Sequence, residues 1–198
     1  MAKELEIIRI INTQLKATTL IDKRFQKGYF GEIAELIIRD EGDNNVLIPC
    51  IVDNDGRCTD VFIDDKFPFQ NYYILKSFKS EDSSDMNFGN AGTVSEQMAD
   101  FTMVVAGYRP TLLLTQLELI AAVSAGMISE LTKTQITSLG SSAIQSVNIT
   151  PPEINIDKQA IFNSQCGVKD LYLQPEYILF TVDFKIETTI TAACFSVC

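Results

Sequence analysis

The sequence predicts an α+β domain in which two helices pack on a mainly antiparallel sheet. The chain has 198 residues, of which 46% are apolar and 21% charged, as in a folded protein with a hydrophobic core. Apolar residues recur at helical spacing in residues 3–21, whereas residues 177–190 alternate apolar and polar residues as a strand does. We therefore expect one structural domain over residues 1–198.

An amphipathic helix is predicted over residues 3–21. Its apolar stripe comprises Leu5, Ile8, Ile11 and Leu15, widened by Ile7 and Ile10. So broad a stripe indicates that more than one partner covers it. The following segment EIAELIIRDEG can be a continued helix or a strand, and its β-branched residues Ile37 and Ile38 favour a strand.

A β-hairpin is predicted next. The apolar runs VLIPCIV (46–52) and RCTDVFID (57–64) flank the turn DNDG, in which Gly56 supplies the positive φ of a tight turn. Pro49 cannot donate to a ladder, so we expect the first strand at a sheet edge or at a bulge. The segment NYYILKSF (71–78) is predicted to be a third strand.

Residues 79–97, KSEDSSDMNFGNAGTVSEQ, are predicted to form a long loop or arm because they contain almost no aliphatic residues. The strand ADFTMVVAGY (99–108) follows. Pro110 suits the first turn of a second, central helix, which we expect to end between Gly126 and Leu139. One side of this helix carries Leu112, Leu113, Leu117, Ile120 and Val123.

The last third of the chain is predicted to return to strands. These are AIQSVNI (143–149), QAIFN (159–163) and the long YILFTVDFKIETTI (177–190). In the long strand, alternation from Ile178 to Ile186 predicts one face on the core and one face largely in water. Residues 191–198 are expected to form a C-terminal tail.

Composition excludes several function classes. The net charge is −10, and Lys and Arg are scattered, so binding of nucleic acid through phosphate neutralisation is not expected. No run of about 18 apolar residues predicts a membrane helix, and the start of the chain lacks the apolar core of a signal peptide. The chain has no histidine, which excludes Ser-His-Asp and Cys-His catalysis and most zinc sites.

The five cysteines show no CxxC spacing: Cys50, Cys58, Cys166, Cys194 and Cys198. Without an export signal, we expect them to be reduced thiols in a cytosolic compartment. Only Cys58 follows a cation, Arg57, that could activate it as a nucleophile. The segment FGNAG (88–92) lacks the Lys-Ser/Thr of a phosphate-binding loop and is interpreted as loop.

The hairpin holds the densest group of carboxylates: Asp53, Asp55, Asp60, Asp64 and Asp65. With Gly56 at the sixth position of a calcium loop, Ile51 takes the first position and Phe62 the twelfth, so two ligands are missing. Another calcium or magnesium site stays open, as does a carboxylate pair formed by Asp60 and Asp64. We favour a solvated or interfacial strand face, with no catalytic, cofactor-binding or metal-ligating residue.

Two segments, VFIDDKFPFQNYYILKSF (61–78) and IFNSQCGVKDLYLQPEYILFTVDFKI (161–186), resemble the sheet segments of tail-terminator and head-to-tail connector proteins of tailed bacteriophages. The resemblance extends to chain size and to the order of elements over most of residues 3–190. The chain departs from the family pattern in the 79–97 insertion and in its cysteine-bearing tail.

The resemblance implies a non-enzymatic virion protein, assembled in the host cytoplasm, that forms a homo-oligomeric ring in the phage neck or tail without a cofactor or a membrane. Such a ring contacts other neck, portal or tail proteins, and an acidic lumen lets DNA pass without sticking. The alternative is a cytoplasmic module that binds a cation or small ligand through the acidic 53–65 hairpin.

Overall fold

A computed structural model describes residues 2–17, 30–40, 45–52, 55–61, 69–83, 94–127, 144–150, 152–161 and 174–191. Its helices are α1 (Ala2–Ala17), α2 (Arg109–Leu112), α3 (Gln116–Gly126) and α5 (Lys158–Ile161). Its strands are β1 (Phe30–Asp40), β2 (Asn45–Val52), β3 (Cys58–Asp60), β4 (Phe69–Ser83), β5 (Val94–Tyr108), β6 (Ile144–Ile149), β7 (Glu153–Asn155) and β8 (Tyr177–Thr191).

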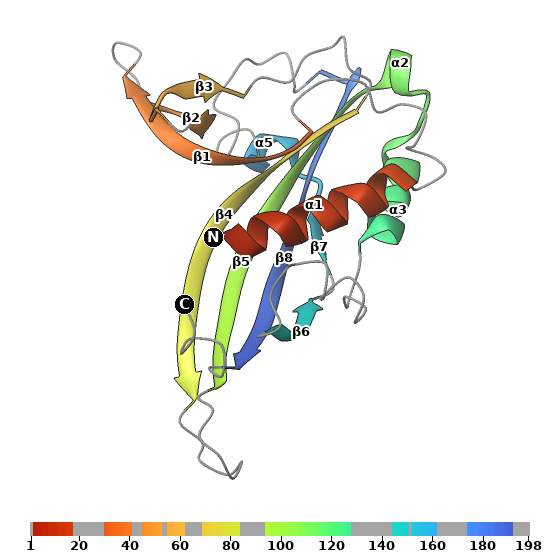
Figure 1. The fold of residues 1–198 in the computed structure, drawn as a ribbon. Helices are drawn as coiled ribbons and strands as arrows, with labels where there is room; N and C mark the ends of the chain where they lie inside the picture. The colour runs from red at the N-terminus through yellow and green to blue at the C-terminus, as the bar shows by residue number, and fades with distance from the viewer. Residues whose placement is uncertain are drawn as a thin grey trace.

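The strands form one sheet in the order β3-β2-β1-β4-β5-β8-β6, and β7 also pairs with β8 (Figure 1). All pairings are antiparallel except that of β1 with β4. The three strands β4, β5 and β8 have 15 residues each and run side by side. The predicted α+β class with a mainly antiparallel sheet is confirmed.

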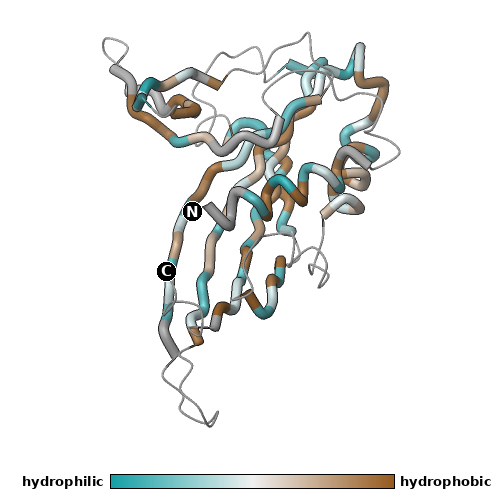
Figure 2. Tube along the Cα trace, in the orientation of Figure 1, coloured by the Kyte–Doolittle hydropathy of each residue, from teal (hydrophilic) through white to brown (hydrophobic). Residues whose placement is uncertain are grey.

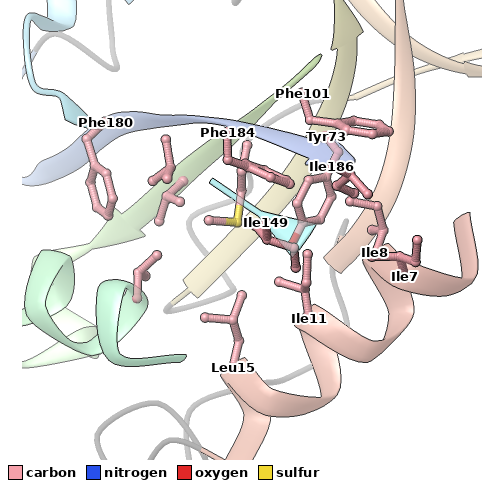
Figure 3. Packing of buried hydrophobic residues seen from close by; sticks show 14 of the residues in the cluster. Ile7, Ile8, Ile11, Leu15, Tyr73, Phe101, Ile149, Phe180, Phe184 and Ile186 are labelled. Atoms are coloured by element: carbon pink, nitrogen blue, oxygen red, sulfur yellow. The ribbon is translucent and has the colours of Figure 1, made fainter. Parts of the chain in front are cut away.

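Helix α1 packs on one face of this sheet through the predicted apolar stripe. Ile7, Ile8, Ile11 and Leu15 are fully buried and point toward the strands (Figure 3). Burying a side chain of this kind contributes about 1.5–3 kcal/mol, so these four residues anchor the helix. Helix α3 lies beside α1 and buries Leu119, Ala122, Val123 and Gly126.

The main core lies between these helices and the apolar side chains on one face of β5 and β8. The hydropathy along these strands changes from residue to residue (Figure 2). Phe184 sits at the centre of this core, stacked on Phe101 with ring centroids 5.8 Å apart and edge-on to Tyr73 at 6.1 Å. Aromatic pairs at these separations add about 0.5–1.5 kcal/mol beyond area burial.

The opposite face of the sheet holds a second, smaller core: Ala34, Val61, Tyr72, Ile74, Val104, Ala106, Ile161 and Leu179. Its presence corrects one prediction for β8, because Leu179 and Thr181 are buried and not exposed to water. Further along the strand the prediction is right, since Asp183, Lys185 and Glu187 are half-exposed.

The predicted 79–97 loop is too long at both ends. Strand β4 continues to Ser83 and β5 begins at Val94, with Lys79 opposite Met98 and Ser83 opposite Val94. Cross-strand hydrogen bonding holds these polar residues in strands, a contribution that composition does not reveal. Residues 84–93 lie outside the described part of the chain.

The predicted central helix is two helices. Leu113 follows α2 with a φ of 56°, in the left-handed region, and α3 begins after Thr115. A capping box starts α3: Glu118 N–H donates to Thr115 Oγ1 at 3.2 Å, and Thr115 N–H donates to Glu118 Oε2 at 2.8 Å. Leu113 and Leu117, expected on the buried side, are each 77% exposed.

The prediction of a strand at 159–163 is wrong for its described residues. Asp157 Oδ1 accepts hydrogen bonds from the backbone N–H groups of Gln159 and Ala160, each at 3.1 Å, and so caps helix α5. The predicted strands at 143–149 and 177–190 are confirmed as β6 and β8. Strand β8 includes Thr191, which was assigned to the tail, and residues 192–198 are not described.

Candidate functional site

The acidic hairpin forms as predicted but assembles no metal site among the residues that the structure describes. Strands β2 and β3 pair with Val52 opposite Cys58, and Gly56 turns the chain with a φ of +77°. Asp55 is exposed at this turn, and Asp60 pairs with Cys50 through the backbone. The described residues include no group of three His, Cys, Asp or Glu that could hold a metal ion.

Asp53, Asp64 and Asp65 lie outside the described residues, as does Phe62. A calcium or magnesium site of another kind and the pairing of Asp60 with Asp64 therefore stay sequence hypotheses.

Pro49 corrects the prediction of an edge strand. Strand β2 lies between β1 and β3, with Pro49 opposite Leu36 of β1 and without a bulge. Val61 N–H donates to Pro49 O at 2.8 Å, and the proline nitrogen faces the same side. Since proline has no N–H, the reciprocal bond is absent, and β3 ends at Asp60, the preceding residue.

Cys50 and Cys58 form a disulfide, which corrects the expectation that both are reduced. Their Cα atoms are 5.5 Å apart, a separation that a disulfide spans readily. The β2–β3 register makes these residues diagonal neighbours, and Cys50 is buried while Cys58 is exposed. Cys58 is thus no activated thiolate in this state, and the disulfide ties the short strand β3 to β2.

A buried polar network joins α1 to the sheet and was missed from the sequence. Tyr73 O–H donates to Asn12 Oδ1 at 3.0 Å. Asn71 Nδ2 lies 3.2 Å from Asn12 Oδ1, 3.3 Å from the Tyr73 hydroxyl oxygen and 3.3 Å from Met103 Sδ. Asn71 and Tyr73 are fully buried and Asn12 is 7% exposed.

Burial raises the pKa of Tyr73 well above its ordinary value, and its hydrogen bond with Asn71 opposes this rise. The phenol therefore stays protonated and acts as a donor. Asn71 Oδ1 is buried without a partner among the described residues, so the network is incompletely satisfied. The sequence signal for this network was the presence of two asparagines, Asn12 and Asn71, within apolar runs. Its role is to fix how α1 docks, because the amide and hydroxyl groups meet in one geometry.

The lower half of the sheet, beyond the second core, presents a polar face that no described helix covers, and we call it the open face. Its charged residues are exposed or half-exposed: Lys76, Lys79, Glu81, Glu96, Asp100, Glu153, Asp183, Lys185 and Glu187. These are six carboxylates and three ammonium groups, so the open face is acidic on balance.

Several of these side chains are already paired. Lys76 Nζ lies 2.9 Å from Asp183 Oδ1, which also accepts a hydrogen bond from Thr102 Oγ1. Ser77 Oγ donates to Asp100 Oδ2 at 2.5 Å. These contacts link the strands β4, β5 and β8, and they fix the positions of the carboxylates of Asp100 and Asp183 on the sheet.

Lys158 on α5 holds the turn that precedes β8. Its Nζ donates to Tyr177 O at 2.5 Å and to Gln174 O at 3.1 Å. Burial lowers the pKa of Lys158, and the nearby Arg109 lowers it further, while Glu176 opposes them. Both acceptors are backbone carbonyls, which indicates a structural clamp.

The junction of α2 and α3 exposes apolar side chains. Leu113 and Leu117 are each 77% exposed, and Leu113 adopts a backbone conformation that costs a branched residue about 1–2 kcal/mol.

No protein-family model matches the chain, and no curated protein shows significant similarity to it. In the described part of the chain, every helix is too short or too polar to cross a membrane.

Proposed function

We propose that the protein is a non-enzymatic structural component of a tailed bacteriophage, which assembles in the host cytoplasm into a homo-oligomeric ring of the virion neck or tail. The proposal joins the resemblance of segments 61–78 and 161–186 to one structural observation. That observation is the open face: helices α1 and α3 pack on one side of the long sheet, and among the described residues the lower part of its other side is polar and uncovered (Figure 1).

The open face supports a channel-lining role. An antiparallel sheet tolerates one face on a core and one face in water, as the lower halves of β5 and β8 do here. In a ring, α1 and α3 lie on the outer side and the open face lines the lumen. The excess of carboxylates repels the phosphates of duplex DNA, so DNA passes through the lumen without being retained.

Axial contacts with neighbouring neck, portal or tail proteins suit the junction of α2 and α3. This junction lies at one end of the long sheet, opposite the end where β4 finishes and β5 begins (Figure 1). Leu113 and Leu117 supply exposed apolar surface there, which a partner ring would bury.

The test is the mass of the purified protein by light scattering over a dilution series. The proposal predicts one discrete species whose mass is a fixed multiple of 22.0 kDa. A protein that is strictly monomeric at every concentration refutes it.

A further inference from the structure

Among the described residues, the lower half of the sheet ends in two unpaired strand edges. Within the described residues, β4 pairs with β1 only from Asn71 to Ile74, and residues 75–83 pair with β5 alone. On the other side, β6 pairs with β8 alone. We call these the β4 edge (residues 75–83) and the β6 edge (residues 144–149). Each presents backbone N–H and C=O groups that can pair with another strand.

The two edges lie at the same height on the sheet. The cross-strand registers place Phe78 of the β4 edge and Ile149 of the β6 edge in one row, through Ala99 and Ile186. A second copy can therefore be set beside the first, edge to edge, without an axial shift. A head-to-tail contact without axial shift closes into a ring when its rotation divides the full circle, whereas a shifted contact winds into a filament.

Strand direction also allows this contact. The four strands β4, β5, β8 and β6 alternate in direction because each neighbouring pair is antiparallel. With four alternating strands, β4 and β6 run in opposite directions. Two copies with the same axial orientation thus bring β6 of one against β4 of the next as an antiparallel pair, the more stable arrangement.

The β6 edge is chemically suited to pairing. Thr150 N–H donates to Lys185 O at 3.0 Å on the β8 side, so the backbone groups of Ile149 and Val147, which alternate with it, face outward. The edge has no charged residue and no proline, which natural proteins use to keep an exposed edge unpaired; the β4 edge, in contrast, carries Lys76, Lys79 and Glu81. Its exposed side chains are those of Gln145, Ser146 and Asn148.

The geometry points to a second copy of this chain as the occupant: we infer that the β6 edge of each subunit pairs with the β4 edge of the next. The antiparallel sheet is then continuous around the ring, with the open face toward the lumen. This inference rests on the proposed ring and names the surface that closes it.

Pairing of the two edges without an axial shift predicts which side chains meet between copies. Asn148 shares its row with Lys79, and Ser146 shares its row with Glu81. All four belong to the same face of the sheet. A charge placed at 148 or 146 therefore comes opposite a known charge of the next subunit.

The test is a charge swap followed by light scattering. The β6 variant Ser146→Glu with Asn148→Lys sets two like-charge pairs across each contact, and we expect it to weaken each contact about tenfold and dissociate the ring. Adding Glu81→Lys with Lys79→Glu makes both pairs attractive and restores the ring.

Two controls keep the result interpretable. Ala121→Lys with Ala125→Glu adds the same charges at exposed positions of α3 and leaves the ring intact. Circular dichroism and thermal unfolding confirm that each variant folds.

Each outcome decides a different claim. Rings that persist in the β6 variant, or a loss that the β4 reversals fail to repair, overturn the edge pairing and leave the proposed ring standing. A wild-type protein that is monomeric throughout overturns the ring and the pairing together.

Discussion

The buried network of Asn12, Asn71 and Tyr73 predicts a non-additive pair of substitutions. Asn12→Leu keeps the number and branching of the side-chain heavy atoms but removes the acceptor of the Tyr73 hydroxyl, which lies 3.0 Å away. A buried donor without an acceptor costs about 1–3 kcal/mol, so we expect a loss near 2 kcal/mol. Tyr73→Phe removes the donor itself and costs about 1 kcal/mol.

The double variant tests the mechanism. Once Tyr73→Phe has removed the hydroxyl, Asn12→Leu no longer leaves it unsatisfied, and Asn71 Nδ2 keeps Met103 Sδ as an acceptor at 3.3 Å. The two substitutions together should therefore cost about 2 kcal/mol and not the sum of about 3 kcal/mol. The assay is urea unfolding at pH 7. The slope of the free energy of unfolding against urea concentration must be the same for all variants. The protein concentration is chosen so that all variants are in the same assembly state.

Thr13→Leu, at an exposed position next to Asn12 on α1, is the matched control and should change stability by no more than about 0.5 kcal/mol. Losses for Asn12→Leu and Tyr73→Phe that add to within about 0.3 kcal/mol would refute the network as a coupled unit. So would an Asn12→Leu variant as stable as the wild type.

Three further predictions concern single features. Cys58→Ser should lower the free energy of unfolding by about 2.5 kcal/mol, which is the loop-closure value for a separation of eight residues. A reductant should destabilise the wild type by a similar amount and leave the stability of this variant unchanged. Leu113→Gly should raise stability by about 1 kcal/mol in thermal unfolding because glycine adopts a φ of 56° without strain, and a loss would contradict this. The folded pKa of Lys158 lies below its ordinary value of 10.5, so the unfolded chain holds this proton more tightly. The stability of the wild type relative to Lys158→Met should therefore increase as pH rises toward 10.5, and a flat or falling difference would contradict the shift.

The parts of the fold that local pattern determines were predictable. The apolar stripe of α1, the Asp-Gly turn between β2 and β3 and the alternation along β8 each record a period or a turn preference in adjacent residues. Each of these elements is present, because local preference and tertiary burial agree there.

The parts that depend on distant partners were not predictable. Residues 79–83 are strand because they pair with 94–98, and residues 94–97 also pair with β8 on their other side. Leu179 is buried because residues from other elements, such as Ile161 and Ala34, form a second core on its face. The disulfide required the β2–β3 register. The break at Leu113, in contrast, had a local signal, the Thr-x-x-Glu capping box at 115–118, which we did not recognise.

The candidate site followed the same division. The acidic hairpin was predictable as a candidate site because its carboxylates are close together in sequence. The acidic surface that the structure assembles instead comes from β4, β5, β7 and β8. Its members, such as Glu81, Asp100 and Glu187, are far apart in the chain and share a face only through the sheet register. A single sequence carries no signal for such a face until the strand pairing is known.

Electron microscopy of the assembled protein tests the central claim most directly. The account predicts closed rings with an open channel, in which the long sheets line the lumen and helices α1 and α3 lie on the outer wall. Particles with a filled centre, rings whose lumen is lined by helices, or single subunits of 22.0 kDa would contradict it.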